Sequence, residues 1–256
     1  MEISLLKEPL GFLRLLEWIF AIAAFATCAN FSTNTGYHVD CKYNDTKTNG
    51  TVCFDLKVTR HLSYPFNLDA ISNNIISSDD INATDCIDTN KVYEQSEDNH
   101  LGATIFIFVG VSSFMLATFY LTLFIFCPYL YLGSDKKGPI ADLCASSMIA
   151  ILWLLASSAW AHGVIGFKYY AHAEWLYSSD QSPCLKNDGH FINKNISDCF
   201  WYDHGSFGGA NASILMGFLN SFLWFCNMWF IYKETNWFHR RNPSYNIPDQ
   251  QQHTVS

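Results

Sequence analysis

Long apolar stretches alternate with polar stretches along this chain. Four of the apolar stretches carry few charges and exceed the ~20 residues that a helix needs to cross a bilayer core. They span residues 10–31, 101–127, 140–165 and 207–232. Since backbone amides in lipid must find hydrogen-bond partners within their own segment, each stretch is predicted to be a transmembrane helix. The pattern therefore predicts an all-α membrane protein built as a four-transmembrane-helix bundle.

The first apolar stretch has features of a cleavable signal peptide. Lys7 and Arg14 precede an apolar run that ends in small residues. The run already begins at Leu10, however, which makes it too long for a signal peptide. Arg14 and Glu17 lie one helical turn apart, so they can pair and reach toward one membrane interface. We therefore expect this segment to remain as a membrane helix.

Basic residues predict the orientation of the bundle. The N-terminus, residues 128–139 and the tail from residue 233 would share one side of the membrane, opposite two loops at 32–100 and 166–206. The three segments on the shared side carry Lys7, Arg14, Lys136, Lys137, Lys233, Arg240 and Arg241. By the positive-inside rule this side is cytosolic. Both termini are thus expected in the cytosol.

Glycosylation sequons favour the same orientation. N-x-S/T sequons occur at Asn30, Asn44, Asn49, Asn82, Asn195 and Asn211, all within or beside the two loops. Two of these asparagines abut the membrane and are poorer acceptors. The expected N-glycosylation sites are Asn44, Asn49, Asn82 and Asn195. The loops are therefore expected to face the lumen of the secretory pathway.

Five of the nine cysteines lie in these two loops, as is usual where disulfides can form. The second loop has one internal pairing, Cys184–Cys199, which closes a ring of ~15 residues and contributes about 3 kcal/mol. The first loop holds Cys41, Cys53 and Cys86, so three pairs are possible and one cysteine is left over. Outside the loops, Cys127 at the cytosolic end of a span is a candidate for palmitoylation.

Composition and motifs exclude several function classes. The net charge is −8, and the acidic residues concentrate between Asp40 and Asp98. No basic stripe suited to nucleic acid is present. The chain contains no P-loop, G-x-S-x-G elbow, H-E-x-x-H or C-x-x-C metal pair, and its nine histidines are scattered. We expect neither enzymatic activity nor a metal or other cofactor.

The fourth apolar stretch carries small and polar residues at helical spacing. They are Ser213, Gly217, Asn220, Trp224 and Asn227, separated by four, three, four and three positions. This spacing defines one continuous helix face, and such residues join helices in lipid. The stripes expected to pack in the same bundle are Ala21, Ala24 and Cys28 on the first helix and Ser147, Leu154, Ser158 and Ala161 on the third.

Ionisable residues inside a membrane often mark a permeation path. Arg14, Glu17 and Asp142 are expected near the cytosolic interface, and His162 near the other one. No span shows the broken-helix pattern of a transporter. An oligomeric channel-forming four-span protein is the alternative that the sequence leaves open.

Several short sequence strings in the spans and the first loop are distinctive. They are Lys7-Glu8-Pro9-Leu10-Gly11-Phe12, Ser157-Ser158-Ala159-Trp160-Ala161 and Gly217-Phe218-Leu219-Asn220, with Tyr64-Pro65-Phe66 in the first loop. Together they resemble the synaptophysin family (synaptophysin, synaptoporin and pantophysin), whose membrane region is a MARVEL domain. The likeness covers about residues 7–236. The tail is short and lacks Tyr-Gly repeats, which resembles pantophysin-like members.

The resemblance implies a MARVEL domain over residues 1–236 and a short cytosolic tail over 237–256. It implies one disulfide per luminal loop, which by position favours Cys41–Cys86 and leaves Cys53 unpaired, together with Cys184–Cys199. It further implies a protein of synaptic-like or secretory transport vesicles. Cholesterol as a bound lipid, a synaptobrevin-type SNARE partner and homo-oligomerisation are the implied contacts, through which the protein would organise vesicle membrane and trafficking.

The tail offers one motif of its own. Asn242-Pro243-Ser244-Tyr245 resembles the N-P-x-Y turn that endocytic adaptors read. Asn-Pro favours a turn, which would present Tyr245. A sorting signal formed by Asn242, Pro243 and Tyr245 is one interpretation, and a disordered tail without a specific reader is the other.

Overall fold

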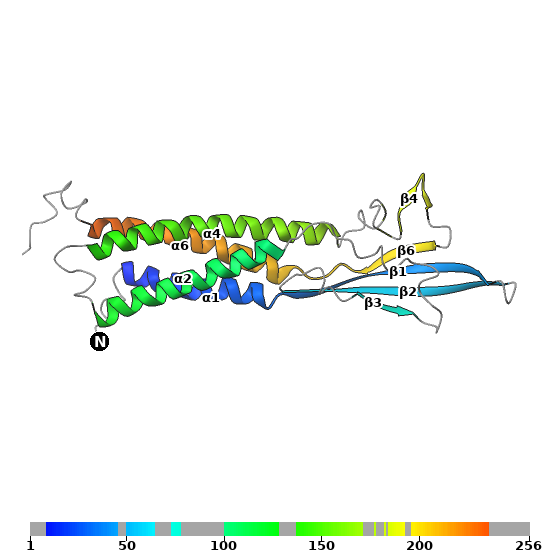
Figure 1. The fold of residues 1–256 in the computed structure, drawn as a ribbon, viewed down its shortest axis with the longest axis horizontal. Helices are drawn as coiled ribbons and strands as arrows, with labels where there is room; N and C mark the ends of the chain where they lie inside the picture. The colour runs from blue at the N-terminus through cyan, green and yellow to red at the C-terminus, as the bar shows by residue number, and fades with distance from the viewer. Residues whose placement is uncertain are drawn as a thin grey trace, which may run out of the picture. The chain divides into compact units, whose positions relative to one another are not determined.

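The structure, a computed structural model of the 256-residue chain, shows four long helices and two sheets among the residues that it describes (Figure 1). It describes residues 9–45, 50–64, 73–77, 100–127, 137–170, 177, 182, 184–192 and 196–235. The helices are α1 (Pro9–Ala29), α2 (His100–Phe126), α4 (Lys137–Tyr170) and α6 (Gly208–Glu234). The strands are β1 (Ser32–Asp45), β2 (Gly50–Ser63), β3 (Asn73–Ser77), β4 (Lys186–Asn187), β5 (His190–Phe191) and β6 (Ile196–Asp203).

All four helices are long and apolar enough to cross a membrane, so the predicted spans are confirmed. Their most apolar stretches have mean hydropathies of 1.7, 2.0, 1.9 and 1.5 in chain order. The third helix is the one that departs most from its expected bounds, because it begins at Lys137 and ends at Tyr170. Pro139 lies in its first turn, where a missing amide hydrogen leaves no bond unmade.

The chain forms two compact units, and each helix contributes to both. We call Met1–Phe25, Phe106–Ser158 and Ile214–Ser256 the helical unit. We call Ala26–Ile105 and Ala159–Ser213 the sheet unit. The two units are described separately below.

The larger sheet joins the first loop, residues 32–100, to the second loop, residues 166–206. Its strand order is β3-β2-β1-β6, and the pairs are antiparallel. β1 and β2 form a long hairpin, whereas β6 comes from the second loop and pairs with β1, with Val39 opposite Cys199. The first and second loops are therefore one structural element in this protein.

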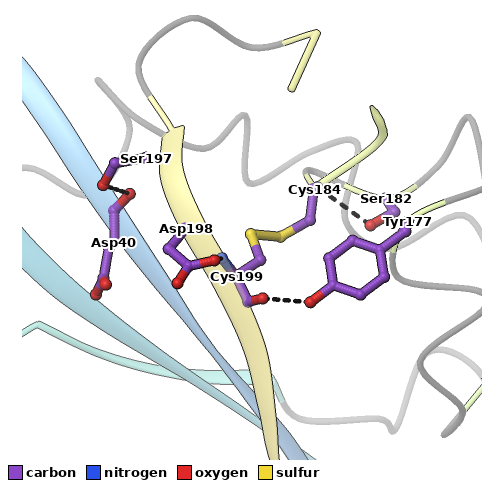
Figure 2. Close-up of a disulfide and its surroundings, with 7 residues drawn as sticks. All are labelled: Asp40, Tyr177, Ser182, Cys184, Ser197, Asp198 and Cys199. Carbon is purple, nitrogen blue, oxygen red and sulfur yellow. Dashed lines mark hydrogen bonds between the residues drawn. A yellow bond between two sulfur atoms is a disulfide. The ribbon is translucent and has the colours of Figure 1, made fainter. Parts of the chain in front are cut away.

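One face of this sheet is an apolar core. Tyr37, Val39, Leu56 and Val58 are fully buried, as expected when alternate positions of neighbouring strands point to the same side. The disulfide that the second loop was expected to form, Cys184–Cys199, lies in this core (Figure 2). The bridge attaches the segment before β4 to β6.

The other face of the sheet carries a row of aspartates. Asp40 on β1 lies directly opposite Asp55 on β2 and Asp198 on β6. Burial, together with the two neighbouring carboxylates, raises the pKa of Asp40, and His38 opposes this shift. His38 contacts Asp55 at 2.9 Å between Nδ1 and Oδ1. Like charges directly across a strand pair destabilise a sheet, so this row disfavours the folded sheet when all three carboxylates are ionised.

Candidate functional site

The helices of the helical unit turn polar groups inward and apolar groups outward. On α1, Arg14, Glu17, Ala21 and Ala24 are fully buried at spacings of three, four and three residues, which is one helix face. The outward positions are large and apolar, and include Phe108, Met115, Met148, Leu155 and Leu215, each at least 60% exposed. Such a surface suits acyl chains.

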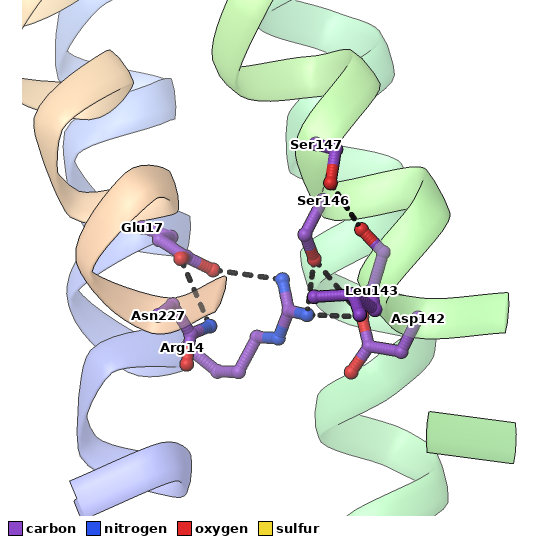
Figure 3. A network of polar contacts seen from close by, with 7 residues as sticks. All are labelled: Arg14, Glu17, Asp142, Leu143, Ser146, Ser147 and Asn227. Atoms are coloured by element: carbon purple, nitrogen blue, oxygen red, sulfur yellow. Dashed lines mark hydrogen bonds and ion pairs between the residues drawn. The ribbon is translucent and has the colours of Figure 1, made fainter. Parts of the chain in front are cut away.

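A network of charged and polar side chains lies where α1, α4 and α6 meet (Figure 3). Arg14 donates from Nη1 to Glu17 Oε2 at 2.9 Å, and from Nη2 to Asp142 Oδ1. Arg14 Nη2 also donates to Ser146 Oγ at 2.8 Å, while the Ser146 hydroxyl donates to Asp142 Oδ1. From α6, Asn227 Nδ2 donates to Glu17 Oε1 at 3.0 Å. Glu17 and Asn227, 210 positions apart in the chain, are thus hydrogen-bonded directly, and the Arg14 guanidinium joins α1 to α4.

Two aromatic rings enclose the Arg14 guanidinium. Its Cζ atom lies 4.9 Å from the ring centroid of Tyr120 on α2 and 4.6 Å from that of Trp224 on α6. These distances allow cation–π attraction, which is stronger when the cation is desolvated. All four helices therefore contribute a side chain to the surroundings of Arg14.

The expected position of these charges was wrong in one respect. Arg14 and Glu17 were expected to reach toward the membrane interface, but both side chains, like that of Asp142, are fully buried. Arg14 and Asp142 each lie five residues into their helices, roughly 8 Å along the axis. The guanidinium points into the bundle because its hydrogen-bond partners lie on α1 and α4 within it.

The predicted packing face of α6 is buried along its whole length. Asn220, Trp224 and Asn227 are 0% exposed, as is Ser213 nearer the start of the helix. In the sheet unit, Ser213 Oγ accepts a hydrogen bond from Trp160 Nε1 at 2.8 Å. In the helical unit, a Cβ added to Gly217 would overlap the Ser157 hydroxyl and lie 2.6 Å from the Phe106 ring. Glycine thus permits the close approach that such interfaces need.

The packing stripe expected on α4 was wrong by one position. Leu154 and Ser158 are exposed, whereas the stripe one position earlier is buried in the helical unit and includes Ser146, Ala150, Trp153 and Ser157. Ser158 donates its hydroxyl hydrogen to the carbonyl of Leu154, one turn earlier in the same helix. A serine satisfied by its own backbone can face lipid, so small polar residues alone do not define a packing face.

Asn220 has an unusual environment within the described part of the chain. Neither its Oδ1 nor its Nδ2 atom has a hydrogen-bond partner there, although the side chain is fully buried. Trp153 Nε1, Ser157 Oγ and Trp224 Nε1 are likewise without partners among the described residues. Burying a polar group without a hydrogen bond lowers the stability of the folded state. The Asn220 amide therefore makes no stabilising hydrogen bond to the described residues and carries this cost.

The remaining predicted site residues fall largely outside the described residues. Asn44 lies in β1, paired with Thr51 of β2. Those outside are Asn49, Asn82, Asn195, Cys86, Asn242, Pro243 and Tyr245. Cys41 is disulfide-bonded, and its pairing with Cys86 stays a prediction. Cys127 is a free, exposed thiol.

The described residues were searched for side-chain groups that could bind a metal ion. Among them, no group of three or more His, Cys, Asp or Glu side chains is arranged to hold a metal ion. The buried network itself consists of one cation and two carboxylates that are already hydrogen-bonded. Its arrangement is suited to joining helices inside a membrane.

A four-span bundle with polar groups turned inward and apolar groups turned outward defines an integral, multi-pass membrane protein. The family model described as MARVEL, membrane-associating domain, matches residues 5–230. The match includes α1, α2, α4, the larger sheet, the buried network and α6 as far as residue 230. The chain therefore belongs to the MARVEL family.

Proposed function

We propose that this protein is a non-enzymatic organiser of synaptic-like or secretory transport vesicle membranes. The observation that carries the proposal is that the charged and amide side chains of Arg14, Glu17, Asp142 and Asn227 are buried and hydrogen-bonded inside the bundle, whereas large apolar side chains are exposed on its outside. A bundle of this kind acts through the contacts that its outer surface makes with lipid and with other helices. The strings that resemble the synaptophysin family favour vesicles as the place where it acts.

Two kinds of contact follow from the proposal. Sterol would pack against the smooth apolar surface, where α2 exposes Phe108, Met115 and Phe119. A synaptobrevin-type SNARE, or a further copy of this chain, would pack its own membrane helix against the same kind of surface. In lipid these contacts depend on van der Waals packing and interhelical hydrogen bonds, because hydrophobicity alone provides no attraction between helices.

Localisation tests the proposal first. A chain tagged at its tail is expected to co-migrate with small vesicle markers in cells. Exclusive residence at the plasma membrane or in mitochondria would contradict it. Mutating Tyr245→Ala tests in the same cells whether the N-P-x-Y-like tail motif directs recycling, with Tyr232→Phe in the last turns of α6 as the matched control.

Partner capture tests the mechanism. Protein purified in mild detergent is expected to retain a photoreactive sterol and a synaptobrevin-type SNARE after crosslinking. If the protein reaches vesicles but crosslinks to neither the sterol nor the SNARE, the proposed contacts are wrong. The proposed vesicle location would still hold.

The alternative is an oligomeric channel. Within one chain Arg14, Glu17 and Asp142 are buried, and Arg14 is hydrogen-bonded to both carboxylates, which favours packing over conduction. A pore would then have to form between chains. Stable conductance from purified oligomers in planar bilayers would favour this alternative, and silent bilayers with intact oligomers would exclude it.

A further inference from the structure

A pocket lies in the sheet unit, where α1 ends, β1 begins and α6 begins. Its volume is about 480 Å³, which falls within the ~300–1,000 Å³ typical of small-ligand sites. The lining residues come from both ends of the described chain between the membrane helices and the larger sheet. They include Ala26, Asn30, Phe31, Ser32, Ser206 and Gly209.

Hydrogen bonds and an aromatic contact hold the walls of this pocket in place. The backbone amide of Ser206 donates to Thr33 Oγ1 at 2.8 Å, which fixes the segment after β6 against β1. At the end of α1, Phe31 N donates to the carbonyl of Cys28 at 3.2 Å. The Phe31 ring is only 5% exposed and lies 6.0 Å from the Phe207 ring, between centroids. The pocket is therefore formed by the folded chain itself.

The lining combines polar and apolar groups. Asn30, Ser32 and Ser206 are exposed and contribute an amide and two hydroxyls, whereas Ala26 and Phe31 contribute apolar surface. The described residues that line the pocket carry no charge. An ionic ligand would find no counter-ion there, so the lining suits an amphipathic molecule without net charge.

The pocket lies at the ends of two membrane spans. The span of α1 ends at Ala29, and Asn30 follows it directly. The span of α6 begins at Gly208, two residues after Ser206. Polar headgroups flank the hydrocarbon core of a bilayer, so they lie where membrane helices end. A phospholipid is the amphipathic molecule that is abundant at this depth.

We propose that this pocket binds the headgroup of a zwitterionic phospholipid. Its phosphate and ester oxygens accept hydrogen bonds from Asn30, Ser32 and Ser206, and the start of an acyl chain contacts Ala26 and Phe31. The leading amides of α6 have no partner within the helix, which adds to the preference for a phosphate. A sterol has a single hydroxyl and would leave most of these groups without a bond. The inference concerns one site in the sheet unit and does not depend on the vesicle role proposed above.

Two neighbouring glycines in the first turn of α6 offer a matched pair of variants. A Cβ at Gly209 would lie 3.6 Å from the Phe31 ring, an ordinary contact, so Gly209→Leu should fill the pocket without displacing the backbone. Gly208→Leu is the control, because a Cβ at Gly208 meets only Ser206 Oγ, at 3.9 Å. Both positions are exposed, so the two substitutions add the same bulk to the same helix turn.

Photocrosslinking in mild detergent measures binding. Full-length protein is titrated with phosphatidylcholine that carries a photoreactive group on its headgroup, and the labelled peptides are identified. Labelling is expected within residues 26–32 and 206–209 of the wild-type chain. It should be lost in Gly209→Leu and unchanged in Gly208→Leu.

A smaller substitution tests the polar side of the pocket. Ser206→Ala removes one hydroxyl and keeps the backbone bond to Thr33. The lipid concentration for half-maximal labelling should rise about two- to tenfold, as expected for the loss of one neutral hydrogen bond.

Several results would overturn the proposal. These are equal labelling of Gly209→Leu and Gly208→Leu, an unchanged titration in Ser206→Ala, and a glycan on Asn30, whose first sugar would fill the pocket. Stronger labelling of the same segments by a photoreactive sterol or by an anionic lipid would also exclude it. So would equally effective competition by soluble glycerophosphocholine, since the pocket would then bind a free phosphodiester. If Gly209→Leu does not fold, the Ser206→Ala titration and the wild-type competition decide.

Discussion

Replacing Arg14 by glutamine should destabilise the bundle more than any other single charge removal in the helical unit. The guanidinium makes two charge-assisted contacts, to Glu17 and Asp142, each worth about 1.5–3 kcal/mol. Breaking a buried ion pair by removing one partner costs about 3–5 kcal/mol, because the remaining charge stays buried. The two figures agree, so we expect Arg14→Gln to lower the free energy of unfolding by about 3–5 kcal/mol.

Denaturant titration of the purified protein in mixed micelles measures this loss. The matched control is Lys168→Gln, which removes a cation whose Nζ donates to Asn211 at 2.8 Å on the exposed surface of the sheet unit. That contact should be worth less than about 1 kcal/mol. Arg14→Lys should give an intermediate loss, because an ammonium cannot place a planar fork between two carboxylates. Losses that are equal for Arg14→Gln and Lys168→Gln would refute the reasoning.

Three further predictions concern packing, unpaired polarity and pH. Gly217→Ala should lower the free energy of unfolding by about 1–3 kcal/mol, because the added methyl group overpacks against Ser157. A loss below about 0.5 kcal/mol in the same titration, which is typical of surface substitutions, would contradict this. Asn220→Leu should leave stability unchanged or raise it, since it removes an amide without partners; a clear loss would argue against this interpretation. The raised pKa of Asp40 means that the folded sheet gains stability as pH falls and loses it as pH rises through that pKa. Asp40→Asn should therefore raise protection of the sheet amides from hydrogen exchange at neutral pH and flatten its pH dependence, whereas Asp188→Asn should not.

The four helices were predictable because lipid imposes a strong local requirement. A span must be about 20 residues long and apolar, and this can be read without knowing any tertiary contact. The buried face of α6 was predictable for a similar reason, since amides such as those of Asn220 and Asn227 are costly in lipid and turn inward.

The sheet was missed although its signal is present in the sequence. Tyr37, Val39 and Cys41 alternate with polar residues, as do Leu56 and Val58 in the paired strand. The sequons of this region led us to expect a luminal loop. Pairing of β1 with β6 joins residues about 160 positions apart, and a local pattern does not specify such a partner.

The charge network could be predicted only in part. Arg14 and Glu17 were expected to pair, which follows from their spacing of three. Their bonds to Asp142 and Asn227 depend on how the helices pack. That packing depends on close contacts such as the one between Gly217 and Ser157, which the sequence pattern does not specify to within one residue. On α4, the exposed Ser158 and the half-buried Ser147 hydrogen-bond to their own helix, so residue type alone gave the wrong face.

Immunoisolation of intact vesicles through a tag placed after Ser256 tests the central claim most directly. The account predicts that the tag captures small vesicles without detergent, and that the captured chain carries glycans on Asn44 and Asn195 that a glycosidase removes only after the membrane is opened. Both loops should behave alike, because β1 and β6 belong to one sheet. A tag that is accessible only after detergent, or glycans on one loop alone, would contradict the account.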